Sequence, residues 1–193
     1  MQKLESSLKN MTLVLVCFAV VIGCILAYVN HVTEGPIKAQ AEQKLADGIK
    51  AVLCTNDLTV TANDSIKQTI DGKEFTFIIH KAADKSGKEL GAAVESTTGG
   101  FGGDLQVLVG FDTEGKILGY TILQSAETPG LGAKADKWFQ KDGKGSIIGM
   151  NPAEGDLTVS KDGGKVDAIT ASTITSRAFL KAVNQAYKAY KNK

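Results

Sequence analysis

The sequence predicts an α+β fold, a curved and mostly antiparallel sheet with flanking helices, preceded by one N-terminal transmembrane helix. Three features carry this prediction: a long uncharged run near the N-terminus, several short runs rich in β-branched residues between turn signals, and a helical pattern at the C-terminus. No regular alternation of strand and helix is present, so a parallel α/β sheet is not expected. A chain of 193 residues with 43% hydrophobic content suits one modest domain with an appendage.

Charge and composition exclude several classes of function. The chain has 22 basic and 21 acidic residues, and Arg177 is its only arginine, so a nucleic-acid partner is not expected. Cys54 is the only thiol outside the apolar run, which leaves no disulfide within the domain. The histidines His31 and His80 are isolated, and no Cys-x-x-Cys pair occurs, so no metal site is expected either.

Residues Met11–Val29 form the predicted transmembrane helix. These 19 residues carry no charge, and at ~1.5 Å rise per residue they can cross a hydrocarbon core of ~30 Å. Lys3 and Lys9 precede the run, whereas the first cation after it is Lys38, and basic residues favour the cytoplasmic side. We therefore expect a cytoplasmic tail at 1–10 and, beyond the cytoplasmic (inner) membrane, a domain that faces the periplasm.

Two other interpretations of the apolar run remain open. A cleaved signal peptide is one, although the run is longer than a usual signal h-region and has no small-x-small cleavage site near its end. The other is lipidation at Val21–Cys24, which looks like a degenerate lipobox. Lipobox cysteines normally lead into a polar tether, whereas Ile25–Val29 stays apolar, so an uncleaved anchor is preferred.

Residues 30–56 are expected to link the membrane helix to a domain at 57–193. Thr33–Pro36 ends in Gly-Pro and predicts a break, after which an amphipathic helix is expected from about Ile37 to Leu53. Turns are predicted at Asp71-Gly72 and Ser86-Gly87. The first strands are predicted at three runs rich in β-branched and aromatic residues, Leu58–Ala62, Phe75–His80 and Leu90–Glu95.

A glycine-rich segment and a hairpin come next. Thr97 and Thr98 precede Gly99–Gly103, in which four of five residues are glycine. The glycines permit a ligand to approach the backbone closely, although a flexible loop is the plainer interpretation. Thr97 and Thr98 are candidate ligand contacts. Two alternating runs then flank a turn at Asp112–Gly115 and predict a hairpin, namely Leu105–Phe111 and Ile117–Leu123.

The hexapeptide Glu-Thr-Pro-Gly-Leu-Gly at 127–132 is a second candidate site segment. Pro129-Gly130 predicts a turn whose glycines let the chain pack against a planar ring, while Leu131 can stack on that ring. Glu127 and Lys134 are candidates for its polar edges. A plain β-to-α turn is the alternative. The candidate ligand contacts of this segment are Glu127, Thr128, Gly130, Leu131, Gly132 and Lys134.

Hydroxyl side chains crowd the stretch 170–176, directly before a helical pattern. Five of these seven residues are Ser or Thr, and apolar residues then recur at three- and four-residue steps through Phe179, Val183 and Tyr187. A helix start offers unpaired backbone N–H groups and a positive dipole end, so it can bind a phosphate. The alternative is a simple helix N-cap, in which one hydroxyl accepts a backbone N–H and contributes ~1 kcal/mol.

The beginning of this region resembles the flavinylation motif of the FMN-binding domain family. An acid is followed three residues later by Ser or Thr, then by two small residues and a threonine. By this resemblance Asp167 is the motif acid, Thr170 its hydroxyl residue, and Thr173 the acceptor to which FMN is attached covalently through a phosphodiester. Ala171 and Ser172 depart from the family's usual Gly-Ala, which lowers backbone freedom and adds a competing hydroxyl.

The resemblance covers the whole chain in order: anchor, linker helix, glycine loop, hairpin, Glu-Thr-Pro-Gly loop, acceptor motif and closing helix. Asp167 pins the register, which favours Thr173 over Ser172 or Thr175 as the acceptor. The resemblance also implies that a separate flavin transferase attaches the FMN, with FAD as donor and a divalent metal. In the family, the Glu-Thr-Pro-Gly loop packs beside the bound flavin.

The order of motifs is most similar to the RnfG family, the G subunits of Rnf ion-translocating electron-transport complexes, and is related to the C subunits of sodium-translocating NADH:quinone reductases. This implies a membrane-anchored flavoprotein that relays electrons between the other proteins of a complex and has no independent catalytic site. The sequence itself offers no dinucleotide fingerprint and no nucleophile–base pair. Two other functions stay open: an FMN-binding domain in another respiratory or extracellular electron-transfer route, and a non-redox membrane-tethered binding module.

Overall fold

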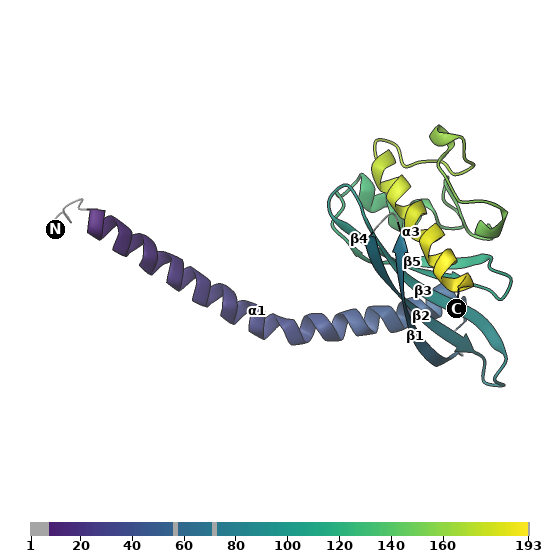
Figure 1. Cartoon of the computed structure of the whole chain (residues 1–193), viewed down its shortest axis with the longest axis horizontal. Coiled ribbons are helices and arrows are strands. Elements are labelled where there is room, and N and C mark those ends of the chain that lie inside the picture. Colours follow the sequence, from purple (N-terminus) through teal and green to yellow (C-terminus); the bar gives the residue numbers. More distant parts are fainter. Residues whose placement is uncertain (1–7, 56–57, 71–72, 193) are drawn as a thin grey trace. The chain divides into compact units, whose positions relative to one another are not determined.

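The computed structural model describes residues 8–55, 58–70 and 73–192. The chain divides into two compact units, with the boundary between Gln43 and Lys44. Figure 1 shows the long N-terminal helix and the domain of sheet and helices. Most of the expected cytoplasmic tail, the expected domain start at residue 57 and the expected turn at Asp71-Gly72 lie outside the described residues.

Helix α1 spans Leu8–Val52 and contains the predicted apolar run without interruption. By length and composition it is the one helix in the described part of the chain that is able to cross a membrane, and none of its most apolar window is buried. Large apolar side chains such as Leu15 and Phe18 are therefore exposed on it, at 71% and 65%. This exposure is what a helix surrounded by lipid requires.

The break expected at residues 33–36 is wrong, because Pro36 lies inside α1. A proline removes one backbone hydrogen bond from a helix, and neighbouring side chains support the helix here. The Thr33 hydroxyl donates to the Val29 carbonyl at 2.8 Å, and the Lys38 ammonium pairs with Glu34 at 2.6 Å. The helix therefore continues through the local breaker signal.

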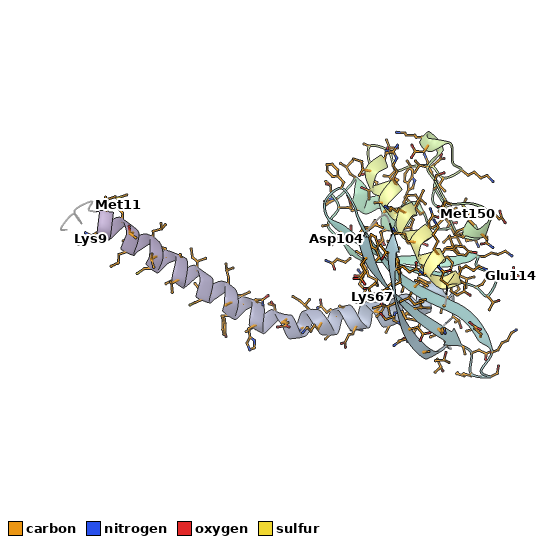
Figure 2. The ribbon with its side chains drawn as sticks, viewed as in Figure 1. Lys9, Met11, Lys67, Asp104, Glu114 and Met150 are labelled. Carbon is orange, nitrogen blue, oxygen red and sulfur yellow. The ribbon has the colours of Figure 1, made fainter. Side chains whose placement is uncertain are left out.

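Five strands form one antiparallel meander in the order β1-β2-β3-β4-β5. This confirms the mostly antiparallel sheet of the predicted α+β fold. The hairpin between β4 and β5 is also confirmed: the Asp112 N–H donates to the Lys116 carbonyl at 3.0 Å, and the Asp112 carboxylate accepts the Glu114 and Lys116 N–H groups. Figure 2 labels Glu114, which lies in the turn of this hairpin. The strands are β1 Thr59–Ile70, β2 Lys73–Ala83, β3 Glu89–Gly99, β4 Asp104–Phe111 and β5 Ile117–Ser125.

Strand β1 is longer than the run predicted for it, because its polar residues pair with β2. Asn63 Oδ1 lies 2.8 Å from His80 Nδ1, and Asp64 forms a salt bridge of 2.7 Å with Lys81. Such cross-strand pairs stabilise a sheet where intrinsic β-propensity is low. His80 Nε2 lies 2.8 Å from the buried Glu95 carboxylate, so the histidine that looked isolated in the sequence belongs to a polar network on the sheet.

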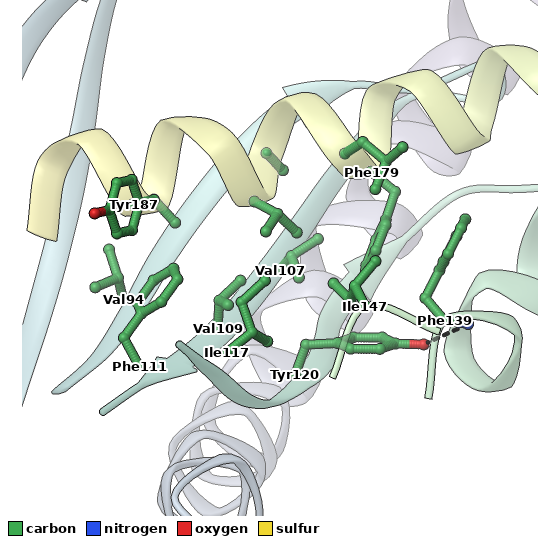
Figure 3. Packing of buried hydrophobic residues seen from close by; sticks show 14 of the residues in the cluster. Val94, Val107, Val109, Phe111, Ile117, Tyr120, Phe139, Ile147, Phe179 and Tyr187 are labelled. Atoms are coloured by element: carbon green, nitrogen blue, oxygen red, sulfur yellow. Dashed lines mark hydrogen bonds between the residues drawn. The ribbon is translucent and has the colours of Figure 1, made fainter. Parts of the chain in front are cut away.

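The main core lies between the sheet and helix α3, which spans Thr173–Lys191 and packs mainly against β3 and β4. Figure 3 shows aromatic and branched side chains that fill this space. Phe139 is stacked on Phe179 with 4.3 Å between ring centroids, and Tyr120 meets the same ring edge-on at 4.7 Å. The hydrophobic stripe predicted for the C-terminal helix is thus the stripe that closes the core.

The last turns of α1 pack on the opposite face of the sheet. Leu108 lies between two core residues of β4, so its side chain points away from α3. A Cβ at Gly110 would lie 2.3 Å from the Val52 carbonyl oxygen, so this glycine lets the strand approach the helix end. The residues buried together here are Ile49, Val52, Leu53, Ala82, Ala93 and Leu108.

Short helical turns connect β5 to α3 and carry several candidate site residues. The Tyr120 hydroxyl fastens this segment to the sheet: it donates to the Ala135 carbonyl at 2.6 Å and accepts the Phe139 N–H at 3.2 Å. Burial raises the pKa of Tyr120 above its ordinary value, so the hydroxyl keeps its proton. The turns are η1 Gly132–Lys134, α2 Ala135–Trp138, η2 Pro152–Glu154 and η3 Ser160–Asp162.

Candidate functional site

The Glu127 carboxylate joins three segments that the sequence singled out separately. Glu127 is only 8% exposed. Its Oε1 accepts the Phe101 N–H at 2.7 Å and the Gly102 N–H at 3.4 Å, and its Oε2 accepts the Thr175 hydroxyl at 2.9 Å. Hydrogen bonds to an ionised carboxylate are stronger than neutral ones. The glycine loop, the Glu-Thr-Pro-Gly loop and the start of α3 therefore meet at one buried group.

Two glycines are required by their close approach to this carboxylate. A Cβ at Gly100 would lie 2.2 Å from Glu127 Oε1. A Cβ at Gly132 would lie 2.4 Å from Glu127 Oε2 and 2.7 Å from the Thr175 hydroxyl oxygen. We expected the glycines to let a ligand approach the backbone closely. In the structure, Gly100 and Gly132 let the Glu127 carboxylate approach instead. At Gly99, in contrast, a Cβ would meet nothing within 4 Å.

The segment in which the sequence predicts the acceptor, called here the acceptor segment, makes a strained turn before α3. Ala171 has φ +60°, in the left-handed region that residues with a Cβ rarely adopt. Ser172 stands at the N-cap position but makes no side-chain cap hydrogen bond. Its carbonyl accepts the N–H and the hydroxyl of Ser176, both at 3.0 Å. The simple serine cap that was the alternative for this region is therefore not formed, and the first-turn N–H groups of α3 receive no bond from the Ser172 side chain.

Thr173 is the first residue of α3, and its hydroxyl lies beside a cation. Lys161 Nζ is 3.3 Å from Thr173 Oγ1, and Thr173 is half-buried. A helix start and an ammonium group both favour a negatively charged group at this hydroxyl. The position therefore has the electrostatic character that a phosphate needs.

Asp167, the expected motif acid, is exposed and is held by two contacts. Its Oδ1 accepts the Ser160 hydroxyl at 3.2 Å, and its backbone carbonyl accepts the indole N–H of Trp138 at 2.8 Å. A Cβ at Gly145 would lie 2.4 Å from that carbonyl oxygen, so only glycine leaves room for it. These contacts connect the acceptor motif to η3 and α2.

A groove of about 560 Å³ lies between the Glu-Thr-Pro-Gly loop and α2. Its lining includes Pro129, Gly130, Lys134 and Trp138. Trp138 also holds the carbonyl of Asp167, so the groove adjoins the acceptor segment. Its volume lies in the range of small-molecule and cofactor sites.

Exposed apolar side chains gather on the segments that Glu127 joins. In the described chain beyond residue 43, four large hydrophobic residues are exposed: Val60 at 39%, Phe101 at 69%, Leu131 at 41% and Ile174 at 54%. Three of them lie close to Glu127. The Phe101 N–H donates to its carboxylate, Leu131 precedes Gly132, which packs against it, and Ile174 precedes Thr175, which donates to it. Each of the three segments that Glu127 joins thus carries one exposed large apolar side chain.

Other candidate residues are engaged elsewhere or remain exposed. The Thr98 hydroxyl donates to the Ala178 carbonyl at 2.9 Å and so fastens β3 to α3, while Thr97 points to the other face of the sheet. Thr175 is fully buried against Glu127. Thr128, Thr170 and Lys134 are exposed, as are Asp167 and Leu131. Among the described residues, no group of three or more His, Cys, Asp or Glu is arranged to hold a metal.

The sequence did not identify Lys161 and its neighbours as site residues. Asp162 forms a bidentate pair with Arg177, at 2.7 and 2.6 Å, which lowers the pKa of Asp162 and raises that of Arg177. The available signal was the charged turn Ser160-Lys161-Asp162 before two glycines. The partners lie 12 and 15 residues further along the chain, beyond the reach of local patterns.

The segments described above lie in an FMN-binding domain, as the match to a known family shows. Residues 100–188 match the family described as the FMN-binding domain, and residues 1–55 match the RnfG N-terminal region. Both matches agree with the order of motifs in the sequence.

Curated relatives show the family. The G subunit of the Na(+)-translocating ferredoxin:NAD(+) oxidoreductase complex of Acetobacterium woodii is 33% identical over 191 residues, which cover 93% of this chain and 90% of the relative. The G subunit of the ion-translocating oxidoreductase complex of Shewanella baltica is 31% identical over 187 residues, with 92% and 87% covered. This chain belongs to the family of G subunits of ion-translocating oxidoreductase complexes. Among solved structures, Shewanella oneidensis NqrC is similar with a TM-score of 0.42 and 20% identity, over 70% of this chain and 71% of that one.

Proposed function

We propose that this chain carries FMN covalently on Thr173, through a phosphodiester, and relays electrons between subunits of an ion-translocating membrane oxidoreductase. The observation that carries the proposal is the Thr173 hydroxyl at the start of α3, 3.3 Å from the Lys161 ammonium. The first-turn N–H groups and this cation favour a bound phosphodiester. FMN, when bound, supplies the redox chemistry of its ring.

Two groups of residues are proposed to hold the cofactor. Thr170, Ser172 and Thr173, with Lys161, hold the phosphate end, and the groove beside α2 holds the ring. Glu127 fixes the surrounding loops, because both of its oxygens already accept hydrogen bonds. The residues proposed to flank the ring are Thr128, Gly130, Leu131, Gly132, Lys134 and Trp138.

Two of the proposed roles require partner proteins: recognition of Asp167 by the flavin transferase, and electron transfer to and from other subunits. Asp167 is proposed to be read by the flavin transferase that attaches FMN, since its carboxylate is exposed on the acceptor segment. The electron donor and acceptor are proposed to be other subunits of the complex. The exposed Phe101, Leu131 and Ile174 around the site suit a surface that is covered when the protein works.

The proposed arrangement in the cell is a single-pass protein of the cytoplasmic membrane. It has a cytoplasmic tail at 1–10, a membrane helix at 11–29, a linker at 30–56 and an FMN-binding domain at 57–193 in the periplasm. The exposed apolar side chains of α1 and the cation Lys9 before them support this arrangement.

The Thr173→Ala chain should carry no covalent flavin, because the only atom proposed to bond the phosphorus is removed. The full-length chain is produced together with a flavin transferase, and ultraviolet fluorescence is recorded in a denaturing gel. Ser172→Ala removes the neighbouring hydroxyl, which is proposed to contact the phosphate without bonding the phosphorus, so this variant should keep the fluorescence. A fully flavinylated Thr173→Ala chain, or flavin mapped to Ser172, would overturn the assignment.

A further inference from the structure

The turn that carries Lys161 is anchored on both sides. Two residues before it, Val159 is 1% exposed in the core and pairs with Val166 in a parallel bridge. One residue after it, the Asp162 carboxylate is fixed by two hydrogen bonds from Arg177. The backbone around Lys161 therefore has a defined position, although the side chain itself is exposed.

Arg177 ties this turn to the helix that carries the acceptor. It lies on α3, four residues after Thr173, so one turn of helix separates the two. Its guanidinium pairs Nε with Asp162 Oδ2 at 2.7 Å and Nη2 with Asp162 Oδ1 at 2.6 Å. A planar fork of this kind fixes orientation as well as distance. The same contact that holds η3 to α3 therefore places Lys161 beside Thr173.

The partner of the Lys161 ammonium is a hydroxyl and not a carboxylate. Within the described ranges Lys161 forms no salt bridge, and its ammonium donates to the Thr173 hydroxyl. In contrast, Lys188 on α3 is paired with Asp156 at 2.9 Å. An uncompensated cation beside the acceptor is ready to pair with an anion attached there.

We propose that Lys161 orients the Thr173 hydroxyl for attachment of FMN and then pairs with the negative charge of the phosphodiester. Asp162 and Arg177 are positioning residues that hold Lys161 in place. The proposal rests on Thr173 being the acceptor. A hydroxyl oxygen has two lone pairs, so the ammonium occupies one and leaves the other for the new bond.

The transfer balances without any redox change. The Thr173 oxygen forms a bond to the phosphorus of the FMN half of FAD, the pyrophosphate P–O bond to the adenylate half breaks, and AMP leaves. The hydroxyl proton passes to solvent. The product at Thr173 is a phosphodiester with one negative charge, which the Lys161 ammonium neutralises.

The test measures the initial rate of FMN attachment to the full-length chain in detergent. Purified flavin transferase, FAD and Mg²⁺ are added, and the mass gained per chain is followed with time. Lys161→Ala should slow attachment ~10-fold, the size expected for one hydrogen bond from a charged group. Lys161→Arg keeps the charge and should restore most of the rate. Lys165→Ala removes an exposed lysine of the same loop and, as matched control, should leave the rate unchanged.

The outcomes separate this inference from the proposed function. A wild-type chain that accepts no FMN would refute the acceptor assignment itself. A wild-type chain that accepts FMN, with Lys161→Ala reacting equally fast, would overturn the role of Lys161. A slow Lys161→Ala that Lys161→Arg does not restore would also overturn it, because charge would not be the cause. Asp162→Asn should lie between wild type and Lys161→Ala, and a wild-type rate there would remove Asp162 from the proposal.

Discussion

At the scale of single residues, Ala171 carries backbone strain two residues before Thr173, the proposed acceptor. The left-handed conformation costs a residue with a Cβ about 1–2 kcal/mol. Neighbouring contacts enforce it: the Ser172 N–H donates to the Ile169 carbonyl at 3.0 Å, and the Ile169 N–H donates to the Ser176 hydroxyl oxygen at 2.9 Å. Strain persists where the surrounding structure fixes the chain in this way. Ala171, the strained residue, stands where the FMN-binding domain family usually has glycine.

Ala171→Gly should therefore raise the free energy of unfolding by about 0.5–1 kcal/mol, since glycine removes the strain but loses more backbone entropy on folding. Urea unfolding measures the change, and FMN attachment should be retained. Ala153→Gly, at an exposed alanine of η2 without positive φ, is the matched control and should not stabilise the protein. A lower unfolding midpoint for Ala171→Gly than for wild type would contradict the strain argument.

At the scale of elements, the glycine loop depends on a carboxylate from another loop. The Gly100 N–H donates to the Gly103 carbonyl at 2.7 Å and closes the loop, while Glu127 accepts the N–H groups at its tip. A single buried acceptor thus holds a segment that would otherwise be free to move. Glu127 therefore fixes the position of the loop.

Gly100→Ala should disrupt this arrangement, because the added Cβ would lie 2.2 Å from Glu127 Oε1. We expect a loss of about 2 kcal/mol or more in the free energy of unfolding, from overpacking and lost hydrogen bonds. Gly99→Ala adds the same methyl group one residue away, where it meets nothing within 4 Å, and should be nearly neutral. Equal urea midpoints for the two variants would show that the close approach to Glu127 is unimportant.

Sequence patterns within single segments predicted most helices and strands. They did not predict the contacts between these elements. The β4–β5 turn was predictable because Asp112 bonds residues no more than four positions away. The partners of Glu127 lie 25, 26 and 48 residues away, so no pattern within one segment marks their contact. The break expected at Pro36 is wrong because a local breaker is outweighed by the helix on both sides. Thr173 as the acceptor stays a prediction from the resemblance, while the contact from Lys161 to its hydroxyl required the fold.

At the scale of the whole molecule, the last turns of α1 belong to the sheet domain. The second compact unit begins at Lys44, and Ile49, Val52 and Leu53 are buried against the sheet. Burial of each such side chain contributes about 1.5–3 kcal/mol. The helix that contains the apolar run therefore also supplies part of the domain's second core cluster.

A chain that begins at Lys44 should fold cooperatively, whereas one that begins at Thr55 should lose roughly 5 kcal/mol or more, because three buried apolar side chains are removed. Circular dichroism and urea unfolding of the two fragments measure this difference. Equal stability of both fragments would show that residues 44–54 are dispensable for the domain.

The proposed topology predicts that protease added to spheroplasts digests the domain, while inverted vesicles protect it. The reason is the cation Lys9 on one side of an apolar run that lacks charge. An antibody to the C-terminus detects the fragments, and a cytoplasmic protein serves as the control for intact membranes. Protection in spheroplasts would place the domain, and its flavin transferase, in the cytoplasm.

Helix α3 gives the attachment site one more property. Thirteen of its 19 residues are buried, and Thr175 in its first turn is fixed by Glu127. Buried helices of this kind open at a higher free energy than exposed loops, which open locally. The FMN proposed on Thr173 would be attached to this helix. Its fluorescence would serve as a built-in probe of global unfolding, without any added dye.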